Sequence, residues 1–457
     1  MNFAHPKKFI VILFLIVLVG IILFFLISDF HISVLFTRKD IHYQYPHSNI
    51  ILISIDTLRA DHLGCYGYKK NTSPHIDKFS EESVLFKQTI AHAPTTLPSH
   101  ASIFTSLIPS HHGSFHTPLS EDMLTMAEIL KLQGYQTVSF NDGGYVSAKF
   151  GFDQGFDLYD SFAKAPKGTF KNRVNKAIKW IKENHPDKFF LFLHTYEVHH
   201  PYTPKEEYLT LFEDDYSGNL PSDISVDLLK DINEKKLIID KEDKSHIINT
   251  YDAEIRSMDQ SFSELLNFLR ENNLYDSTLI IFTSDHGEEF GEHGLMGWHG
   301  VTLFDEVLHI PLIIKFPNSA FSKTVVDQQV RSIDILPTLL NVLDIKTGKI
   351  FEGTSLLRLI KGKKEMLYAV SEIGRRKKSI RTESLKYYKT PSSEMLFDLI
   401  KDPLEQTDIS EDYLDTTKRL KNALESFLNK RPQIFDKDKP NLDKKTLESL
   451  KALGYIR

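Results

Sequence analysis

The chain has 457 residues, of which 41% are hydrophobic and 25% are charged, and its formal net charge is −6. This length and apolar content allow a large hydrophobic core and more than one small domain. The slight acidic excess argues against a nucleic-acid-binding protein, which would carry a clear basic excess. The single cysteine, Cys65, excludes an intrachain disulfide, so packing must stabilise the fold.

The N-terminal segment predicts a membrane anchor. Residues 9–28 form an uncharged apolar run, long enough to cross a hydrocarbon core of ~30 Å as a helix. Lys7 and Lys8 should keep residues 1–8 in the cytoplasm, so the chain beyond a connector at 29–48 should lie outside. A cleaved signal peptide is the alternative, but no small-residue cleavage site follows the run. We expect a single-pass protein of a bacterial inner membrane whose main domain faces the periplasm.

Apolar runs of strand length alternate with amphipathic segments along residues 49–350. The predicted buried strands are 49–55, 83–90, 137–140, 188–193 and 277–283. Residues 124–133 have helical spacing, and Gly134 ends that pattern. Strands that alternate with helices predict an α/β catalytic domain with a mostly parallel central sheet flanked by helices.

Two other regions differ in composition. Residues 205–246 are rich in Lys, Asp and Glu, which indicates a charged insertion that forms either a lid over the site or a solvated helix pair. Residues 351–457 contain short strand-like pieces, including 384–388 and 395–399, and predict a small C-terminal α+β subdomain. Within it, the charged residues 436–445 predict a loose connector.

Side chains that can bind a metal ion or transfer a proton follow three predicted strands. Asp56 follows the first, His194 the fourth, and Asp285 with His286 the fifth. Ligands bind beyond the carboxyl ends of parallel strands, where a carboxylate is costly unless it is paired or bound to a cation. Oxygen ligands with one imidazole suit a divalent cation. The sequence therefore predicts a metal site, although each group alone could be a cap or an ion pair.

Thr96 is the strongest candidate for a nucleophile. It lies in the run 95–99 (TTLPS) before a predicted helix at 101–107, and Pro98 suits the first turn of a helix. The free N–H groups at a helix N-terminus favour an anionic substrate. A threonine hydroxyl beside a metal ion loses its proton more easily and can attack phosphorus or sulfur. The alternative is that Thr96 only caps the helix.

Several long motifs resemble those of the sulfatases in the alkaline phosphatase superfamily. Residues 49–68 (NIILISIDTLRADHLGCYGY) are similar to the family's opening strand and metal loop, and residues 96–102 (TLPSHAS) to its signature C/S-x-P-S-R-A-S. The other matches are 193–202 (LHTYEVHHPY) to D-P-H-x-P-Y, 284–303 (SDHGEEFGEHGLMGWHGVTL) to the second metal loop, and 394–405 (EMLFDLIKDPLE) to the C-terminal E-L-Y-D-L-x-x-D-P-x-E. The resemblance covers nearly all of the chain after the predicted anchor and implies an alkaline-phosphatase-like fold.

The resemblance also implies a metal set. Asp56, Thr96, Asp285 and His286 would hold one divalent cation, with Thr96 at the position of the nucleophile. Ca²⁺ is the usual ion of the family, while the imidazole ligand also suits Mn²⁺ or Zn²⁺, and Mg²⁺ is compatible with the carboxylates.

Four further residues are implied to meet the substrate. His199 would contact the substrate or protonate the leaving group, and His299 falls where the family often places a Lys or His that binds the substrate anion. His100 stands where the signature has Arg. Arg59 could bind the anion, or it could instead form a salt bridge with Asp61. For His199 and His299 the alternative is a structural role in a polar cleft.

The chain departs from the family at the nucleophile. Sulfatases convert a Cys or Ser into formylglycine, and Thr96 cannot become that aldehyde, so no formylglycine is expected. Threonine there, and Thr57 where many sulfatases carry Asp, resemble the phosphotransferases and phosphodiesterases of the superfamily.

The leading interpretation is a metal-dependent hydrolase of a phosphate or sulfate ester, with phosphate favoured by Thr96. The substrate would be a sulfated or phosphorylated glycan, a lipid or a small-molecule ester, not a nucleic acid. One alternative is a phosphotransferase resembling phosphoethanolamine or glycerophosphate transferases and acting on a lipid or glycan. The other is a catalytically inactive binding domain, which the presence of both metal loops argues against.

Overall fold

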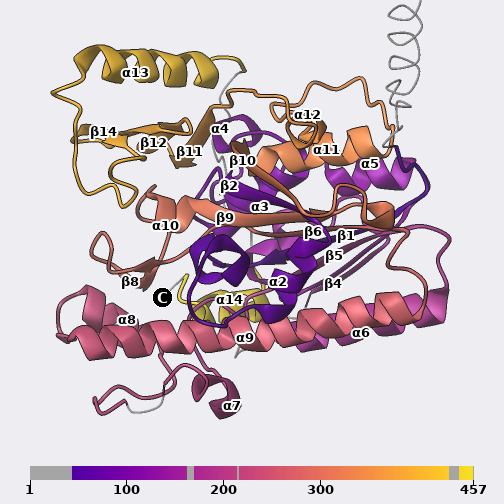
Figure 1. Ribbon diagram of the computed structural model, residues 1–457, viewed down its shortest axis with the longest axis horizontal. Helices are drawn as coiled ribbons and strands as arrows, with labels where there is room; N and C mark the ends of the chain where they lie inside the picture. The colour runs from indigo at the N-terminus through magenta and orange to yellow at the C-terminus, as the bar shows by residue number, and fades with distance from the viewer. Residues whose placement is uncertain (1–43, 162–168, 214–215, 432–441, 456–457) are drawn as a thin grey trace, which may run out of the picture. The chain divides into compact units, whose positions relative to one another are not determined.

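The computed structural model describes residues 44–161, 169–213, 216–431 and 442–455 (Figure 1). Within them, an eight-stranded sheet has the order β10-β2-β9-β6-β1-β5-β3-β4. In that order the strands span Thr324–Arg331, Val84–Ile90, His309–Lys315, Thr278–Ser284, Asn49–Ile55, Phe189–Thr195, Gln136–Asn141 and Leu158–Ser161. Strand β9 is antiparallel to both of its neighbours, and the other pairs are parallel. The predicted mostly parallel α/β sheet is therefore present.

Helices cover both faces of the sheet because its central strands are apolar on both sides, as is typical of parallel strands. Side chains of β1 alternate between two cores: Ile51 and Ile53 enter one, and Ile50 and Leu52 enter the other. Figure 1 shows α6 and α9 side by side along one face, and α5 and α11 over the other. The helices of the first face are α2 (Pro74–Glu81), α6 (Phe170–Asn184) and α9 (Lys241–Glu271); those of the second are α3 (Thr96–Thr105), α5 (Met126–Leu132), α11 (Ile335–Val342) and α12 (Leu357–Ile360).

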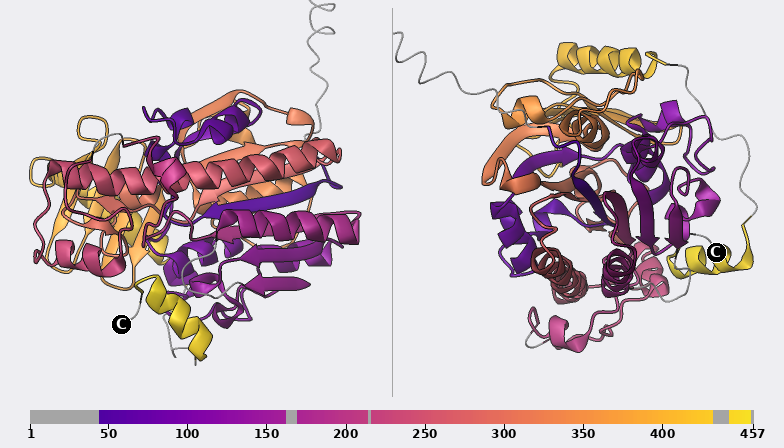
Figure 2. Two further views of the ribbon diagram at one scale, coloured as in Figure 1. Left: turned by 90° about the horizontal axis from the view of Figure 1, so that it is seen from below. Right: turned by 90° about the vertical axis from the view of Figure 1, so that its right-hand side faces the viewer.

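The C-terminal region forms the predicted small α+β unit. Its antiparallel sheet runs in the order β11-β12-β13-β14, through Ala369–Ile373, Lys377–Arg381, Leu385–Lys389 and Glu394–Asp398. Helix α13 (Leu414–Leu428) buries Leu420 and Leu424 against this sheet. A last helix, α14 (Lys444–Ala452), returns to the main domain, where Leu450 and Leu453 join the core that contains α3 (Figure 2).

The remaining elements are short. They comprise α4 (Pro109–His112), α7 (Glu206–Leu209), α8 (Val226–Asn233), α10 (Asp305–Leu308) and a small hairpin of β7 (Glu289–Phe290) and β8 (Met296–Trp298). The charged segment 205–246 supplies α7, α8 and the first turns of α9. Asn233 of α8 hydrogen-bonds the backbone of Met296 in β8, which fixes this segment beside the hairpin. Its action as a lid stays a prediction.

The prediction of an N-terminal transmembrane helix must be corrected, because no described helix of this fold has that character. Residues 9–28 lie outside the described residues, and within those residues no helix is both long and apolar enough to cross a membrane. Apolar length alone was the basis of the expectation, whereas the long described helix α9 is apolar on one side only and carries charged residues along its length. The architecture is therefore an α/β domain with a small C-terminal subdomain, and no membrane helix is assigned to it.

Candidate active site

Two neighbouring strands, β1 and β6, deliver predicted metal ligands to one edge of the sheet. Strand β1 lies between β5 and β6, and Ile55 at its end pairs with Thr195 and Ser284 at the ends of these neighbours. Asp56 continues β1 by donating its N–H to the backbone oxygen of Thr195 over 3.0 Å. Asp285 follows β6 directly, so the parallel arrangement brings residues far apart in sequence into contact.

Asp56, Asp285 and His286 form a buried group whose ligand atoms all lie within 4.8 Å of one another. The Nε2 atom of His286 is 3.8 Å from Asp56 Oδ1 and 3.5 Å from Asp285 Oδ2. Within the described residues, none of these three atoms has a hydrogen-bond partner. Buried polar atoms are rarely left in that state. Two carboxylate oxygens and one imidazole nitrogen that point at one spot fit a divalent cation.

The other atoms of these ligands are held in place by hydrogen bonds. Asp285 Oδ1 accepts the N–H groups of Thr57 and His286, at 3.3 and 2.9 Å. His286 donates from Nδ1 to the carbonyl of Gly287 at 2.9 Å, which leaves Nε2 without a proton in the neutral ring. Such outer contacts orient metal ligands and fix the histidine tautomer.

The electrostatics of the two aspartates also favour a cation. Burial and the neighbouring Asp285 raise the pKa of Asp56 well above its usual range. Burial alone would raise the pKa of Asp285 too, but His286, His100 and His194 outweigh it and lower that pKa. Two buried carboxylates this close resist joint ionisation unless a positive charge lies between them.

Thr96 lies at the start of α3 and faces the metal ligands. The helix begins at Thr96, earlier than the predicted start at residue 101, with Thr95 in an extended conformation before it. The Thr96 hydroxyl donates to Asp56 Oδ2 at 3.2 Å and lies 2.7 Å from the hydroxyl of Tyr455. Ser99 on the next turn donates to the carbonyl of Asp285 at 2.6 Å, which ties α3 to the end of β6. The predicted nucleophile and three predicted metal ligands therefore meet.

A second buried group combines His199, His200 and His299, whose ligand atoms also lie within 4.8 Å of one another. His200 and His299 both donate from Nδ1 to Glu288 Oε1, at 2.8 and 3.0 Å. His199 donates from Nδ1 to the carbonyl of His200. Burial lowers the pKa of His199 and of His299, so the free protein holds both rings neutral. Their rings lie 4.9 Å apart, and His299 lies 4.5 Å from the ring of His286.

Two of the residues predicted to contact the substrate, Arg59 and His100, are instead engaged by protein groups. Arg59 is held by Asp61 at 2.7 Å and Glu292 at 2.7 Å, and it donates to the carbonyl of Glu288 at 3.0 Å, which is the salt-bridge alternative considered above. His100 is fully buried behind Thr96, between the Ser54 hydroxyl at 3.0 Å and the Thr96 carbonyl at 2.9 Å. Arg59 and His100 thus contact the backbone of Glu288 and Thr96. Their contact with a substrate stays a prediction.

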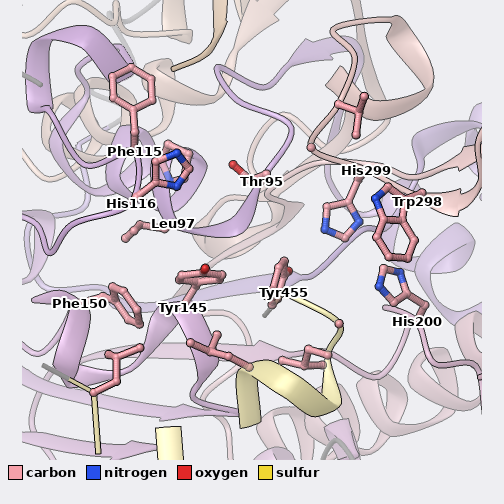
Figure 3. A pocket seen from close by; sticks show the side chains of 17 residues that line it. Thr95, Leu97, Phe115, His116, Tyr145, Phe150, His200, Trp298, His299 and Tyr455 are labelled. Atoms are coloured by element: carbon pink, nitrogen blue, oxygen red, sulfur yellow. The ribbon is translucent and has the colours of Figure 1, made fainter. Parts of the chain in front are cut away.

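A cavity of about 500 Å³ opens beside this site, and we call it the apolar cavity (Figure 3). Thr95, His299 and Tyr455 line it, and Figure 3 shows His299 and Tyr455 side by side across from Thr95. His200 lies flat against Trp298, with ring centroids 5.1 Å apart. Tyr455 and Trp298 were not identified from the sequence, because neither follows a predicted strand or lies in a nucleophile motif.

Two family models and several known proteins match this chain. The family model described as "Sulfatase" matches residues 48–345, and a second, "N-sulphoglucosamine sulphohydrolase, C-terminal", matches residues 291–431. An "Ulvan-active sulfatase" of Formosa agariphila is 27% identical, and the match covers 84% of this chain and 80% of that relative. An "Arylsulfatase" of Clostridium perfringens is 24% identical, with coverage of 85% and 95%.

Solved structures show the same fold. The phosphonate monoester hydrolase of Agrobacterium radiobacter aligns with a TM-score of 0.69 at 22% identity, over 83% of this chain and 95% of that one. A protein solved with its substrate D-glucosamine-2-N,6-O-disulfate aligns with a TM-score of 0.70 at 20% identity, over 84% and 99%. The predicted alkaline-phosphatase-like architecture is thereby confirmed for the described domain.

Proposed function

We propose, because the chain belongs to the sulfatase family of the alkaline phosphatase superfamily, that it is a metal-dependent hydrolase of phosphate esters with Thr96 as nucleophile. Hydrolysis of sulfate or phosphate esters follows from the family; the metal requirement and the threonine chemistry are our proposal. The observation that carries it is the position of the Thr96 hydroxyl, 3.2 Å from Asp56 Oδ2. Beside it lie three buried ligand atoms, Asp56 Oδ1, Asp285 Oδ2 and His286 Nε2, and each of them lacks a hydrogen-bond partner among the described residues.

Asp56, Asp285 and His286 would hold the divalent cation, with the Thr96 oxygen as a further ligand. When bound there, the cation lowers the pKa of the threonine hydroxyl and offsets the negative charge of the ester. The Thr96 hydroxyl gives up its proton to water and Oγ1 attacks phosphorus; the bond from phosphorus to the leaving oxygen breaks, and that oxygen takes up a proton from His199 or His299. Water then attacks the phosphothreonine, and the bond from phosphorus to Thr96 breaks to release phosphate.

The rings of His199 and His299 lie 5.2 and 5.8 Å from the ring of Tyr455, whose hydroxyl contacts Thr96, and they are the candidates for contact with the leaving group. In the free protein their Nδ1 protons are engaged, so Nε2 carries a lone pair. An anionic ester beside these rings raises their pKa and favours protonation at Nε2, because an opposite charge stabilises the imidazolium. The protonated ring can then donate to the leaving oxygen.

Threonine favours phosphorus over sulfur for a chemical reason. The sulfatase route in the resemblance above uses an aldehyde hydrate, which a threonine side chain cannot form. A direct threonine attack leaves a phosphothreonine that resolves by attack of water at phosphorus. The name of the phosphonate monoester hydrolase among the solved structures fits a fold that accepts phosphorus esters.

The first test compares Thr96→Ala with Thr96→Ser on phosphate monoesters, phosphate diesters and sulfate esters. We expect Thr96→Ala to lower kcat by about 10³-fold or more, because the nucleophile is lost, and Thr96→Ser to keep measurable activity. Intact-mass spectrometry after a rapid acid quench should show one added phosphoryl group on the wild type and none on Thr96→Ala. Sulfate-ester turnover that survives Thr96→Ala would overturn the assignment.

Metal removal gives an independent test. Dialysis against a chelator should abolish phosphate-ester turnover, and adding back Ca²⁺, Mn²⁺, Mg²⁺ or Zn²⁺ separately should identify the ion that restores it. Elemental analysis of Asp285→Asn should show loss of bound metal. The same assay run with added alcohols distinguishes the phosphotransferase alternative, which would transfer the phosphoryl group to the alcohol, from hydrolysis. An inactive binding domain would turn over no ester at all.

A further inference from the structure

The apolar cavity lies next to the nucleophile, because it is lined by the residue before Thr96 and by the residue that hydrogen-bonds the Thr96 hydroxyl. Thr95 precedes the nucleophile and lines the cavity, and Tyr455, which also lines it, hydrogen-bonds the Thr96 hydroxyl at 2.7 Å. The volume of about 500 Å³ falls within the range of sites that hold small organic molecules. An ester attacked by Thr96 therefore places its organic group in or beside this cavity.

Much of the cavity lining is apolar. Leu97 of α3, Phe115 and Phe150 line it, and each of these side chains is at most 6% exposed. Leu450 of α14 and Leu453 after it add two further apolar side chains. Segments from the start and the end of the described chain thus enclose a space that water fills poorly and that an apolar group would occupy favourably.

Aromatic rings line the same space. Tyr145 meets Tyr455 edge to face with centroids 4.8 Å apart, and it packs against Phe150 at 4.9 Å. Trp298 lines the cavity next to His200. Such rings contact flat or chain-like apolar groups with little loss of conformational freedom, because they are already held by their neighbours.

The described lining of the cavity offers few charged side chains to a charged organic group. None of the described residues that line it is Lys, Arg, Asp or Glu, and its ionisable imidazoles are those of His116, His200 and His299. Recognition of a carboxylate or of a second sulfate group relies on Arg or Lys. Among the described residues that line the cavity, a polyanionic sugar chain would therefore find no Lys or Arg to offset its lost hydration.

We propose that the apolar cavity binds the organic group of the ester and selects esters in which this group is uncharged and apolar, either an aromatic ring or an alkyl chain. This inference rests on the proposed function, since it assumes that Thr96 attacks an ester. The substrate class differs from the one printed for the ulvan-active sulfatase, whereas the name of the arylsulfatase fits its aromatic part.

The direct test compares octyl phosphate with glucose 6-phosphate. Both esters release a primary alcohol, so their intrinsic reactivity is closely matched, and only the organic group differs. We expect kcat/KM to be at least about 100-fold higher for octyl phosphate, because binding an apolar group of several carbons in such a pocket is favoured by this order. Naphthyl phosphate, tested against octyl phosphate, shows whether rings or chains fit better.

A pair of substrates that differ in charge tests whether the cavity excludes a charged organic group. Phenyl phosphate and 4-carboxyphenyl phosphate differ by one negative charge, and the wild type should prefer phenyl phosphate. Val301 lines the cavity and is 41% exposed, so Val301→Lys should be tolerated and should reduce this preference by about tenfold. The matched control is Val325→Lys on β10, which replaces a 50% exposed valine that does not line the cavity and should leave the preference unchanged.

The outcomes separate the two proposals. If glucose 6-phosphate is turned over as well as octyl phosphate, in a Thr96-dependent reaction, the inference about the cavity is wrong while the proposed function stands. If the two valine variants change the phenyl preference equally, the cavity does not contact the organic group. If no phosphate ester is hydrolysed in a Thr96-dependent way, the proposed function itself fails.

Discussion

At the residue scale, Glu288 connects the two groups of side chains in the site. Its carboxylate accepts from His200 and His299 on one oxygen and from the Tyr202 hydroxyl on the other. Burial disfavours the ionised form, but the neighbouring His200 and His299 outweigh it and hold the pKa of Glu288 well below its usual range. The anion therefore fixes which nitrogen of each ring faces the substrate.

Glu288→Gln should lower kcat by about 10- to 100-fold, because the amide no longer holds both Nδ1–H groups, while elemental analysis should show unchanged metal content. Glu289→Gln is the matched control: burial raises the pKa of Glu289 to about 7, so a neutral amide resembles its resting form. A loss of metal in Glu288→Gln, or equal losses of kcat in both variants, would argue against a positioning role for Glu288.

Residue by residue, the sequence indicated which side chains lie together where strands supply them, while their roles stay predictions. Asp56, Asp285 and His286 follow buried parallel strands that lie next to each other in the sheet. Their closeness in space could therefore be inferred from the order of strands along the chain. Tyr455 could not be found in this way. It reaches Thr96 from a sequence distance of 359 residues, through a packing arrangement of α14 that leaves no local signal.

At the element scale, α4 is joined to the C-terminal region by one buried ion pair. His111 Nδ1 lies 2.5 Å from Glu352 Oε1, and its Nε2 donates to the carbonyl of Leu428 at the end of α13 over 2.9 Å. Burial disfavours charge on His111, but its hydrogen bond with Glu352 outweighs this and raises its pKa; the pKa of Glu352 is lowered, chiefly by the same bond acting against burial.

The pair should make stability depend on pH in a defined direction. The contribution of His111 is complete below its ordinary pKa of 6.5 and is lost as the pH rises through its folded pKa. The contribution of Glu352 is complete above 4.5 and is lost as the pH falls through its folded pKa. Both therefore act fully between these two values.

His111→Gln should thus lower the free energy of unfolding by about 2 kcal/mol near pH 5.5, and by less at pH 9. Urea denaturation at both pH values measures this difference. The exposed His47, changed to Gln, is the control and should show little change at either pH. An equal loss for His111→Gln at both pH values would contradict the ionic contribution.

The predicted elements succeeded or failed for physical reasons. Buried parallel strands read as continuous apolar runs, and the predicted ranges at 49–55 and 277–283 agree with β1 and β6 within one residue. The start of α3 was placed too late, because Thr96 has a low helix propensity in isolation. Here Ser99 anchors the first turn to Asp285, a tertiary contact that sequence patterns do not reveal.

At the scale of the whole molecule, a buried charge network joins the small C-terminal sheet to the main domain. Lys386 of β13 is fully buried and contacts Asp305 of α10 at 2.7 Å and Glu405 at 2.8 Å. Arg381 of β12 adds a second contact to Asp305 at 2.9 Å. Charges this deeply buried are tolerated only when they are paired.

Lys386→Met should therefore lower the free energy of unfolding by about 3–5 kcal/mol, because Glu405 loses its cation. Lys389→Met on the same strand is the control, since Lys389 is about half exposed and its 3.9 Å contact with Glu394 should be worth less than about 1 kcal/mol. Denaturant titration measures both variants. Similar losses in both would show that burial of the network is not the cause.

The architecture was predictable where the order of strands and helices along the chain determines how they stack into layers. Alternating strands and helices predicted the flanked sheet, and the change of pattern after residue 350 predicted further short strands, whose antiparallel pairing in β11–β14 the sequence did not indicate. The membrane helix was predicted from apolar length alone, and no described helix has that character. The return of α14 to the main domain could not be predicted, because the intervening residues carry no packing pattern.

The stacking of His200 on Trp298 has a practical consequence for studying this molecule. The chain has two tryptophans, and the other, Trp180, packs against Phe189 on the far side of the sheet from Leu97. An indole that stacks on an imidazole changes its fluorescence when a new group enters beside it. The enzyme thus carries an intrinsic optical reporter at the mouth of its cavity, readable without any label.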